Sequence, residues 1–161
     1  MLGPTASGKS EVALRFAEEI GAEIISVDSM QVYRRMNIGT AKPNVEERAR
    51  VRHHGIDLVE PSDSFSVADF QAVGRAVLTE SEAPVVIAGG SGLHFRALVD
   101  PMRFRPHDAE VRAQIEELSH REGVERLQAL DAEAGRHVDL ANPRRVTRAL
   151  EIAVLTGETP T

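Results

Sequence analysis

The feature that most constrains this chain is a glycine-rich motif near its start, GPTASGKS over residues 3–10. Its spacing, G-x-x-x-x-G-K-[ST], is typical of loops that bind phosphate. Backbone N–H groups of such a loop surround phosphate oxygens, and the helix that follows directs its positive dipole end at them. Lys9 adds a mobile positive charge, and the Ser10 hydroxyl can ligate Mg²⁺. The motif therefore predicts a site for a phosphorylated ligand and leaves the identity of that ligand open.

The first hundred residues show alternating strand and helix patterns. Val12, Phe16 and Ile20 recur at helical spacing, and Gly21 can end that helix. A glycine-rich loop, 89–92, follows the most apolar strand candidate, and an apolar segment, 93–99, follows the loop. Strands separated by helix-length segments predict a parallel sheet with flanking helices. We expect helices over 11–20, 44–52 and 67–79, with Ser66 as a cap, and strands over 23–27, 56–59 and 84–88.

The composition changes at 101–106, and no strand candidate follows Asp108. We expect helices over 109–122, 124–130 and 143–155, the last one capped by Asn142. The predicted domains are an α/β core over 1–100, a helical insert over 101–141 and the start of a return to the core over 142–161. Only Met1 and Leu2 precede the phosphate loop, where a buried strand is usual. We therefore expect a fragment that lacks a first strand and a C-terminal part.

The composition of the chain excludes several classes of protein and of site. The 161 residues are 42% hydrophobic and 27% charged, which is ordinary for a globular domain. The chain has no cysteine, which excludes disulfides and thiolate metal sites and fits a cytoplasmic location. No apolar run approaches the ~18 residues of a membrane span. A net charge of −6 argues against a protein that coats nucleic acid.

Asp28 follows the strand over 23–27, at the edge where an open parallel sheet binds its ligands. It is a candidate general base or a candidate for support of Mg²⁺, and a helix cap or turn is the alternative. Ser29, Gln31 and Tyr33 offer polar contacts to a second substrate. The loop over 39–43 carries Lys42, and a surface turn is its default interpretation.

Three arginines gather near the start of the last predicted helix. Arg144, Arg145 and Arg148 could contact phosphates, or they could form a solvated basic face. The adjacent pair His53-His54 has poor spacing for a shared metal ion. We therefore predict no metal site other than one for Mg²⁺.

Six segments in this order together resemble one family: GPTASGKS, ISVDSMQVYR, GTAKP, SVADF, AGGSGLHF and RRVTRALE. The set is similar to tRNA dimethylallyltransferases, also called tRNA isopentenyltransferases. The resemblance implies an α/β fold of the P-loop NTPase-like class, with a parallel sheet, flanking helices and an all-helical insert. It implies transfer of a dimethylallyl group from its diphosphate to the exocyclic amine of the adenosine 3′ to the anticodon. It further implies a monomer that uses Mg²⁺ and binds the anticodon stem-loop of tRNA.

The resemblance also assigns site residues. The implied catalytic residues are Asp28, Lys9 and Thr5, and Ser10 is the implied metal ligand. The implied diphosphate contacts are Gly3, Pro4, Thr5, Ala6, Ser7, Gly8, Lys9 and Ser10. The implied tRNA contacts are Asp28, Ser29, Met30, Gln31, Ser91, Arg112, Arg144, Arg145, Val146, Thr147 and Arg148.

The chain departs from the family pattern at the second glycine loop, which usually reads GGTGLY. Ser91 stands in place of Thr and keeps the hydroxyl, whereas His94 stands in place of Tyr. Asn142 stands where Asp is common, and both residues can cap a helix. Three alternatives remain open. They are a P-loop kinase for a nucleotide or small molecule, an isopentenyltransferase for free adenine nucleotides, and a non-catalytic phosphate-binding remnant.

Overall fold

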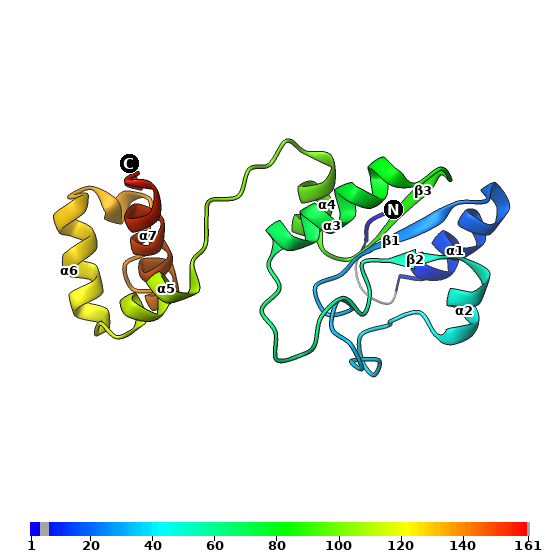
Figure 1. Cartoon of the computed structure of the whole chain (residues 1–161), viewed down its shortest axis with the longest axis horizontal. Helices are drawn as coiled ribbons and strands as arrows, with labels where there is room; N and C mark the ends of the chain where they lie inside the picture. Colours follow the sequence, from blue (N-terminus) through cyan, green and yellow to red (C-terminus); the bar gives the residue numbers. More distant parts are fainter. Residues whose placement is uncertain (4–6, 161) are drawn as a thin grey trace. The chain divides into compact units, whose positions relative to one another are not determined.

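The computed structural model describes residues 1–3 and 7–160 (Figure 1). The chain divides into two compact units, Met1–Met102 and Arg103–Thr161. The first unit contains the sheet and the second contains helices, as the change of composition near residue 101 indicates.

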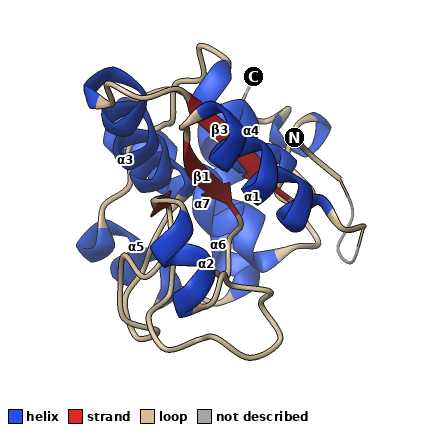
Figure 2. Cartoon of the chain, turned by 90° about the vertical axis from the view of Figure 1, so that its right-hand side faces the viewer, coloured by secondary structure: helices blue, strands red, loops and turns tan. Residues whose placement is uncertain are grey.

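The sheet of the first unit has three parallel strands in the order β2-β1-β3 (Figure 2). They are β1 (Glu23–Val27), β2 (His53–His54) and β3 (Val85–Gly89). Leu2 forms an isolated parallel bridge with Gly89, so the start of the chain lies beside β3. This pairing leads directly into the phosphate loop. The expectation of further sequence before it stays a prediction.

Helices cover both faces of this sheet, which explains the apolar character of its strands. On one face, Leu14 and Ala17 of α1 (Lys9–Ile20) pack on Ile24 and Ala88. On the other face, Ile25 and Val27 pack on Phe70 of α3 (Val67–Glu80) and Leu98 of α4 (Gly92–Val99). Successive strand residues thus point to opposite helix layers.

Local sequence explains where these helices begin and end. Gly21 adopts the left-handed conformation (φ 64°) that ends α1. Asn44 begins α2 (Val45–Arg50) and Ser66 begins α3, each with a reciprocal capping box. The predicted helix 11–20 is confirmed, but its stripe Val12, Phe16 and Ile20 is 42–54% exposed. Ala13, Leu14 and Ala17 form the buried face of α1 instead.

The strand predicted over 56–59 is wrong. The strand lies earlier, at His53–His54, and of 56–59 only Val59 forms a bridge, with Tyr33. Gly55 (φ 77°) and Asp57 (φ 51°) are left-handed, so the chain turns where an extended backbone was expected.

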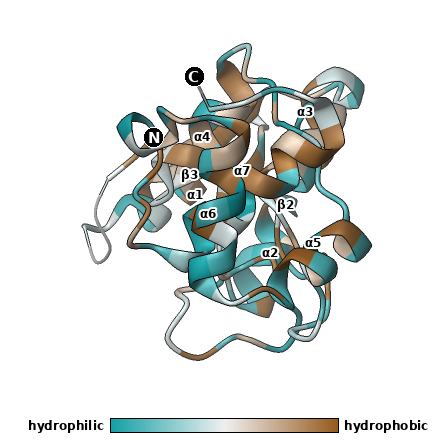
Figure 3. Cartoon of the chain, turned by 90° about the vertical axis from the view of Figure 1, so that its left-hand side faces the viewer, coloured by the Kyte–Doolittle hydropathy of each residue, from teal (hydrophilic) through white to brown (hydrophobic). Residues whose placement is uncertain are grey.

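The second unit packs α5 (Ala109–Glu116), α6 (His120–Leu130) and α7 (Pro143–Thr156), with a 3₁₀ turn, η1 (Ala134–Arg136). Its core is made by Ile115, Leu127, Ala134, Val146 and Leu150. Figure 3 shows hydrophilic and hydrophobic residues on the same helices, as amphipathic packing requires.

One predicted helix boundary in this unit differs from the structure. The helix expected over 109–122 ends at Glu116, because Ser119 caps α6 through a capping box. Helix α7 packs on α5 and α6 within the second unit, and the predicted division of this unit at residue 142 stays a prediction. The assignment of 101–141 as an insert for tRNA stays a prediction. In the described parts of both units, no helix is long and apolar enough to cross a membrane.

Candidate functional site

A cavity of about 620 Å³ opens at the carboxyl ends of β1 and β3. Most of its lining comes from four segments, which are the start of α1 from residue 7, the end of β1 to residue 31, the loop 39–43, and 88–90 at the end of β3. Glu47 of α2 and His53 of β2 complete the lining. Gly89 permits this convergence, since a Cβ there would lie 2.4 Å from the carbonyl oxygen of Val27. The close approach of β3 to β1 therefore requires glycine.

The described part of the phosphate loop lies on one side of this cavity. Gly8 is left-handed (φ 75°) and precedes Lys9, the first residue of α1. A Cβ on Gly3 would lie 3.4 Å from the Ser7 hydroxyl and 3.9 Å from Cδ of Lys9, so Gly3 lies beside the start of α1. Ser7, Gly8, Lys9 and Ser10 all line the cavity. Pro4, Thr5 and Ala6, which the sequence also assigns to this site, lie outside the described residues.

Asp28 lies in the same cavity, at the turn after β1. Its Oδ1 accepts hydrogen bonds from the backbone N–H groups of Met30 (2.8 Å) and Gln31 (3.3 Å). These bonds fix the orientation of the carboxylate. Met30 and Gln31 line the cavity as well, whereas Ser29 is exposed and is not among its lining residues. The structure thus brings Asp28 together with Lys9 and Ser10.

Gln31 has a different surrounding from the one predicted. Its side chain is buried and accepts a hydrogen bond from the Ser26 hydroxyl (2.8 Å). Its Nε2 donates to the carbonyl oxygens of Thr40 (2.9 Å) and Ala41 (3.0 Å). Both hydrogens of the amide are therefore used within the protein. The sequence predicted a contact with the target nucleotide and contained no signal for this bonding.

A second set of bonded side chains, which was not predicted from the sequence, includes Lys42 of the loop 39–43 together with Asp57 and Arg48. The side chain of Lys42 is 1% exposed and pairs with Asp57 (2.7 Å), which also pairs with Arg48 (2.6 Å). Burial raises the pKa of Asp57, but the hydrogen bonds from Lys42 and Arg48 outweigh it and hold the pKa below its usual range. Lys42 is thus a buried partner of Asp57, and not the surface residue expected. Its position as one of only two lysines was the one available hint.

His94 and Ser91 form the start of α4. The Ser91 hydroxyl lies 2.6 Å from Nδ1 of His94, and Ser91 caps the helix. The His94 ring is buried edge-on against Phe70, with ring centroids 4.8 Å apart. Burial lowers the pKa of His94, and the nearby charge of Asp28 opposes that shift. Ser91 is not among the lining residues of the cavity, although its neighbour Gly90 is.

The predicted tRNA-binding residues of α7 take different positions in the second unit. Arg144 and Arg145 are exposed, and Arg145 faces Asp139 at 3.8 Å. Arg148 donates to Glu151 (2.7 Å) and to the carbonyl oxygens of Pro106 (2.9 Å) and Arg105 (3.0 Å). Arg105, Arg144, Arg145 and Arg148 line a hollow of about 530 Å³, which we call the arginine hollow. Val146 departs from the prediction, because its side chain is buried in the core.

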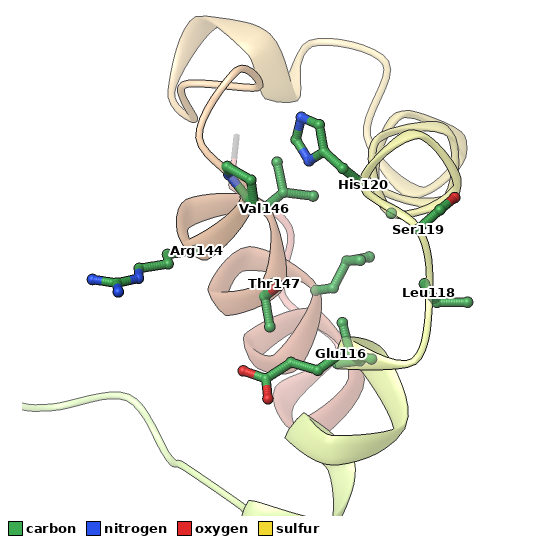
Figure 4. Close-up of a pocket in the computed structure, with 11 residues that line it drawn as sticks. Glu116, Leu118, Ser119, His120, Arg144, Val146 and Thr147 are labelled. Carbon is green, nitrogen blue, oxygen red and sulfur yellow. The ribbon is translucent and has the colours of Figure 1, made fainter.

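Thr147 lines a smaller pocket of about 230 Å³ between the start of α6 and α7. Figure 4 shows His120 directed toward Val146, while the Arg144 side chain points away from the pocket. Arg112 forms an ion pair with Glu116 (2.8 Å) and lines neither the pocket nor the arginine hollow. Among the residues that the structure describes, no group of three or more His, Asp or Glu could hold a metal ion.

Comparisons with known proteins agree with the motif set. The family model described as "IPP transferase" matches residues 31–161. A protein of Moorella thermoacetica named tRNA dimethylallyltransferase is 45% identical over 98% of this chain and 53% of its own length. One of the same name from Geobacter metallireducens is 45% identical over 96% of this chain and 53% of its own. The chain therefore spans about half the length of the curated relatives it matches.

Two solved structures share the fold. A tRNA isopentenylpyrophosphate transferase from Bacillus halodurans has a TM-score of 0.61 and 39% identity, over 98% of this chain and 55% of its own. A eukaryotic dimethylallyltransferase crystallised while acting on tRNA has a TM-score of 0.81 and 24% identity, over 99% of this chain and 42% of its own. The predicted α/β fold of the P-loop NTPase-like class is confirmed.

Proposed function

This chain belongs to the IPP transferase family, and we propose that it transfers a dimethylallyl group from dimethylallyl diphosphate to a tRNA adenosine. The acceptor is the exocyclic amine of the adenosine 3′ to the anticodon, and diphosphate is released. One observation carries the proposal: the phosphate-loop residues Lys9 and Ser10 and the carboxylate of Asp28 line a single cavity. Relatives named tRNA dimethylallyltransferase support it.

The donor side of this reaction needs stabilisation of the leaving group. When the allylic C–O bond breaks, negative charge grows on the diphosphate. Ser7, Gly8 and Lys9 line the cavity with backbone groups and one ammonium, and α1 begins at Lys9. This arrangement suits an anion, because the helix dipole and the lysine charge act on the same oxygens.

The acceptor side needs a group that removes a proton from a weakly basic amine. Asp28 is the carboxylate of the cavity nearest to the end of β1, and two backbone N–H groups hold its Oδ1. A carboxylate held in this way can accept a proton once the amine is aligned with the allylic carbon. The target adenine must leave its stack to enter such a cavity.

Mg²⁺ belongs to the same proposal. Ser10 lines the cavity, and its hydroxyl oxygen is a hard ligand of the kind that Mg²⁺ prefers. When bound, the ion would add positive charge at the diphosphate oxygens.

The arginine hollow supports tRNA as the partner. Arg144 and Arg145 are exposed there and can contact the phosphate backbone, which positions an RNA without specifying its sequence. Overall acidity does not oppose this partner, since a local basic surface is sufficient. The expectations of a monomer and of a cytoplasmic location stay predictions.

The test incubates the chain, and the complete product of its gene, with unmodified tRNA, Mg²⁺ and dimethylallyl diphosphate. Mass spectrometry of the digested nucleosides should then show dimethylallyl-adenosine. Parallel reactions with ATP and with free adenosine nucleotides address the kinase and the free-nucleotide prenyltransferase. Product in either parallel reaction, without modified tRNA, would overturn the proposal. A folded protein that binds the diphosphate without turnover would indicate the non-catalytic remnant.

A further inference from the structure

Gln31 connects three segments that surround the candidate site. Its backbone N–H donates to Asp28 (3.3 Å), and its carbonyl oxygen accepts from the N–H of Asp57 (3.0 Å). Its side chain receives the Ser26 hydroxyl and holds the carbonyl oxygens of Thr40 and Ala41. The end of β1, the turn of Asp28 and the loop 39–43 therefore depend on one buried residue.

The loop 39–43 needs such support because part of it is strained. Ala41 has φ 50°, a left-handed conformation that is unfavourable for a residue with a Cβ. A strained conformation persists only where surrounding contacts determine it. Here Gln31 holds the carbonyl oxygen of Ala41, and Lys42 donates to Tyr33 (2.5 Å) and Asp57. The Thr40 hydroxyl adds a bond to the carbonyl oxygen of Met36 (2.8 Å).

The same loop forms part of the cavity wall. Gly39, Thr40 and Ala41 line the cavity together with Asp28 and Met30. A shift of the loop would therefore change the space next to Asp28, where the proposed reaction places the acceptor. The phosphate-loop residues 7–10 come from another segment, and none of the hydrogen bonds of Gln31 described above reaches them.

We propose that Gln31 is a positioning residue for the acceptor side of the cavity and not a residue that contacts the adenosine. Its hydrogen bonds hold the loop 39–43 in a fixed position relative to the turn of Asp28. The acceptor amine then meets Asp28 in a productive orientation. This inference rests on the proposed function, because it assigns the acceptor to that side.

The chain offers a matched control for this role. Gln71 is half-buried on α3, and its Nε2 also donates to two carbonyl oxygens, those of Ala97 (2.8 Å) and Met102 (2.9 Å). Gln71 is not among the residues that line the cavity. Gln31→Leu and Gln71→Leu therefore remove the same kind of bond pair, one at the cavity wall and one away from it.

Steady-state kinetics of prenyl transfer to tRNA should separate the two variants. We expect Gln31→Leu to lower kcat/KM for tRNA about 10- to 100-fold, since small misplacement of a reacting group has effects of this size. The KM for dimethylallyl diphosphate should change less than about 2-fold. Gln71→Leu should leave both parameters near those of the wild type, although it should lower the melting temperature. Equal kinetic effects of the two variants would overturn the inference.

Two further measurements keep the inference testable if Gln31→Leu folds poorly or if no transfer is seen. Ser26→Ala removes only the bond to Oε1 of Gln31 and should give a weaker effect in the same direction. Amide hydrogen exchange of the 39–43 segment should rise in Gln31→Leu and stay unchanged in Gln71→Leu. No transfer by the wild type would defeat the proposed function, whereas unchanged exchange at 39–43 would defeat the positioning role by itself.

Discussion

In the α/β unit, four segments distant in sequence line one cavity, whereas in the helical unit five consecutive residues, 144–148, separate into different surroundings. Arg144 and Arg145 are exposed, Val146 is buried in the core, and Arg148 holds Glu151 and two backbone carbonyls. In the second unit, residues adjacent in sequence therefore take different surroundings. In the first unit, residues distant in sequence line the same cavity.

The physical reason lies in the two kinds of element. Parallel strands end at the same edge of a sheet, so the loops that follow them converge. A helix instead turns by 100° at each residue, so neighbours point to different sides. A motif at a strand end in the α/β unit thus predicts that its residues lie at one edge of the sheet. A motif on α7 predicts only a helix, whose residues point to different sides.

The largest expected effect tests whether the cavity of the α/β unit acts as one site. Asp28→Asn keeps an oxygen that can accept the N–H groups of Met30 and Gln31 but removes the base. We expect prenyl transfer to fall about 10³-fold, as for loss of a general base, while affinity for dimethylallyl diphosphate stays within about 3-fold. Asp28→Ala should lose transfer as well. Parallel loss of donor affinity in both variants would mean that Asp28 is structural or a metal ligand.

Lys9→Ala tests the donor side of the same cavity. Loss of a charged contact to the diphosphate should weaken binding of dimethylallyl diphosphate about 10- to 100-fold. Isothermal titration with the diphosphate measures this directly. Arg15→Ala is the matched control, because Arg15 is a cation on the same helix that is not among the residues lining the cavity, although its partner Glu11 is. Unchanged affinity in Lys9→Ala would remove the phosphate-loop assignment.

Loss of a buried carboxylate should lower the free energy of unfolding of the helical unit. Glu151 is fully buried, and burial raises its pKa, but hydrogen bonds from Arg148, the Asp108 N–H and His107 outweigh that effect and lower it. Glu151→Ala leaves these donors without their acceptor and should cost about 2 kcal/mol in urea unfolding. Glu125→Ala, which removes an exposed ion pair with Arg121, should change stability little. Similar effects would contradict a structural role for Glu151.

Substitutions of two arginines on α7 should have different effects, one on tRNA binding and the other on the stability of the protein. Arg144→Ala should weaken tRNA binding about 3- to 10-fold and reduce the salt dependence by about one phosphate contact, with little change in melting temperature. Arg148→Ala should lower the melting temperature, because Arg148 holds Glu151 and the carbonyl oxygens of Arg105 and Pro106. Filter binding across a salt series, with thermal melts of both variants, checks this. A lower melting temperature in Arg144→Ala together with weaker tRNA binding alone in Arg148→Ala would contradict the prediction.

The smallest expected effect is a pH dependence in the α/β unit. Burial lowers the pKa of His94, so the folded state binds fewer protons than the unfolded chain. The stabilising effect on the folded state is therefore present above about pH 6.5 and declines as the pH falls below that value, by at most about 1.4 kcal/mol per pH unit for one histidine. The lowered pKa of His53 adds to this decline.

Thermal melts between pH 7.5 and 5.5 should show a flatter profile for His94→Gln than for the wild type. His120→Gln, at an exposed position of α6, serves as the control and should leave the profile unchanged. Identical profiles for all three proteins would exclude His94 as a source of the decline.

The sequence by itself determined the order of elements and the place of the cavity. Glycine at 21, the caps Ser66 and Asn142, and the apolar strands over 23–27 and 84–88 are local signals, and the structure follows them. The phosphate motif and Asp28 each lie next to a strand or helix end, so the topology of a parallel sheet was sufficient to bring them together.

Only the tertiary structure decided which polar side chains face the cavity and which are used within the protein. Gln31, Lys42 and Arg148 each form bonds to groups 9 to 43 residues away along the chain. No local pattern encodes such partners, because a buried amide or charge must be satisfied by whichever donor or acceptor the fold brings near. The turn at Gly55 and Asp57, which displaced β2, has the same origin: the N–H of Asp57 bonds to Gln31.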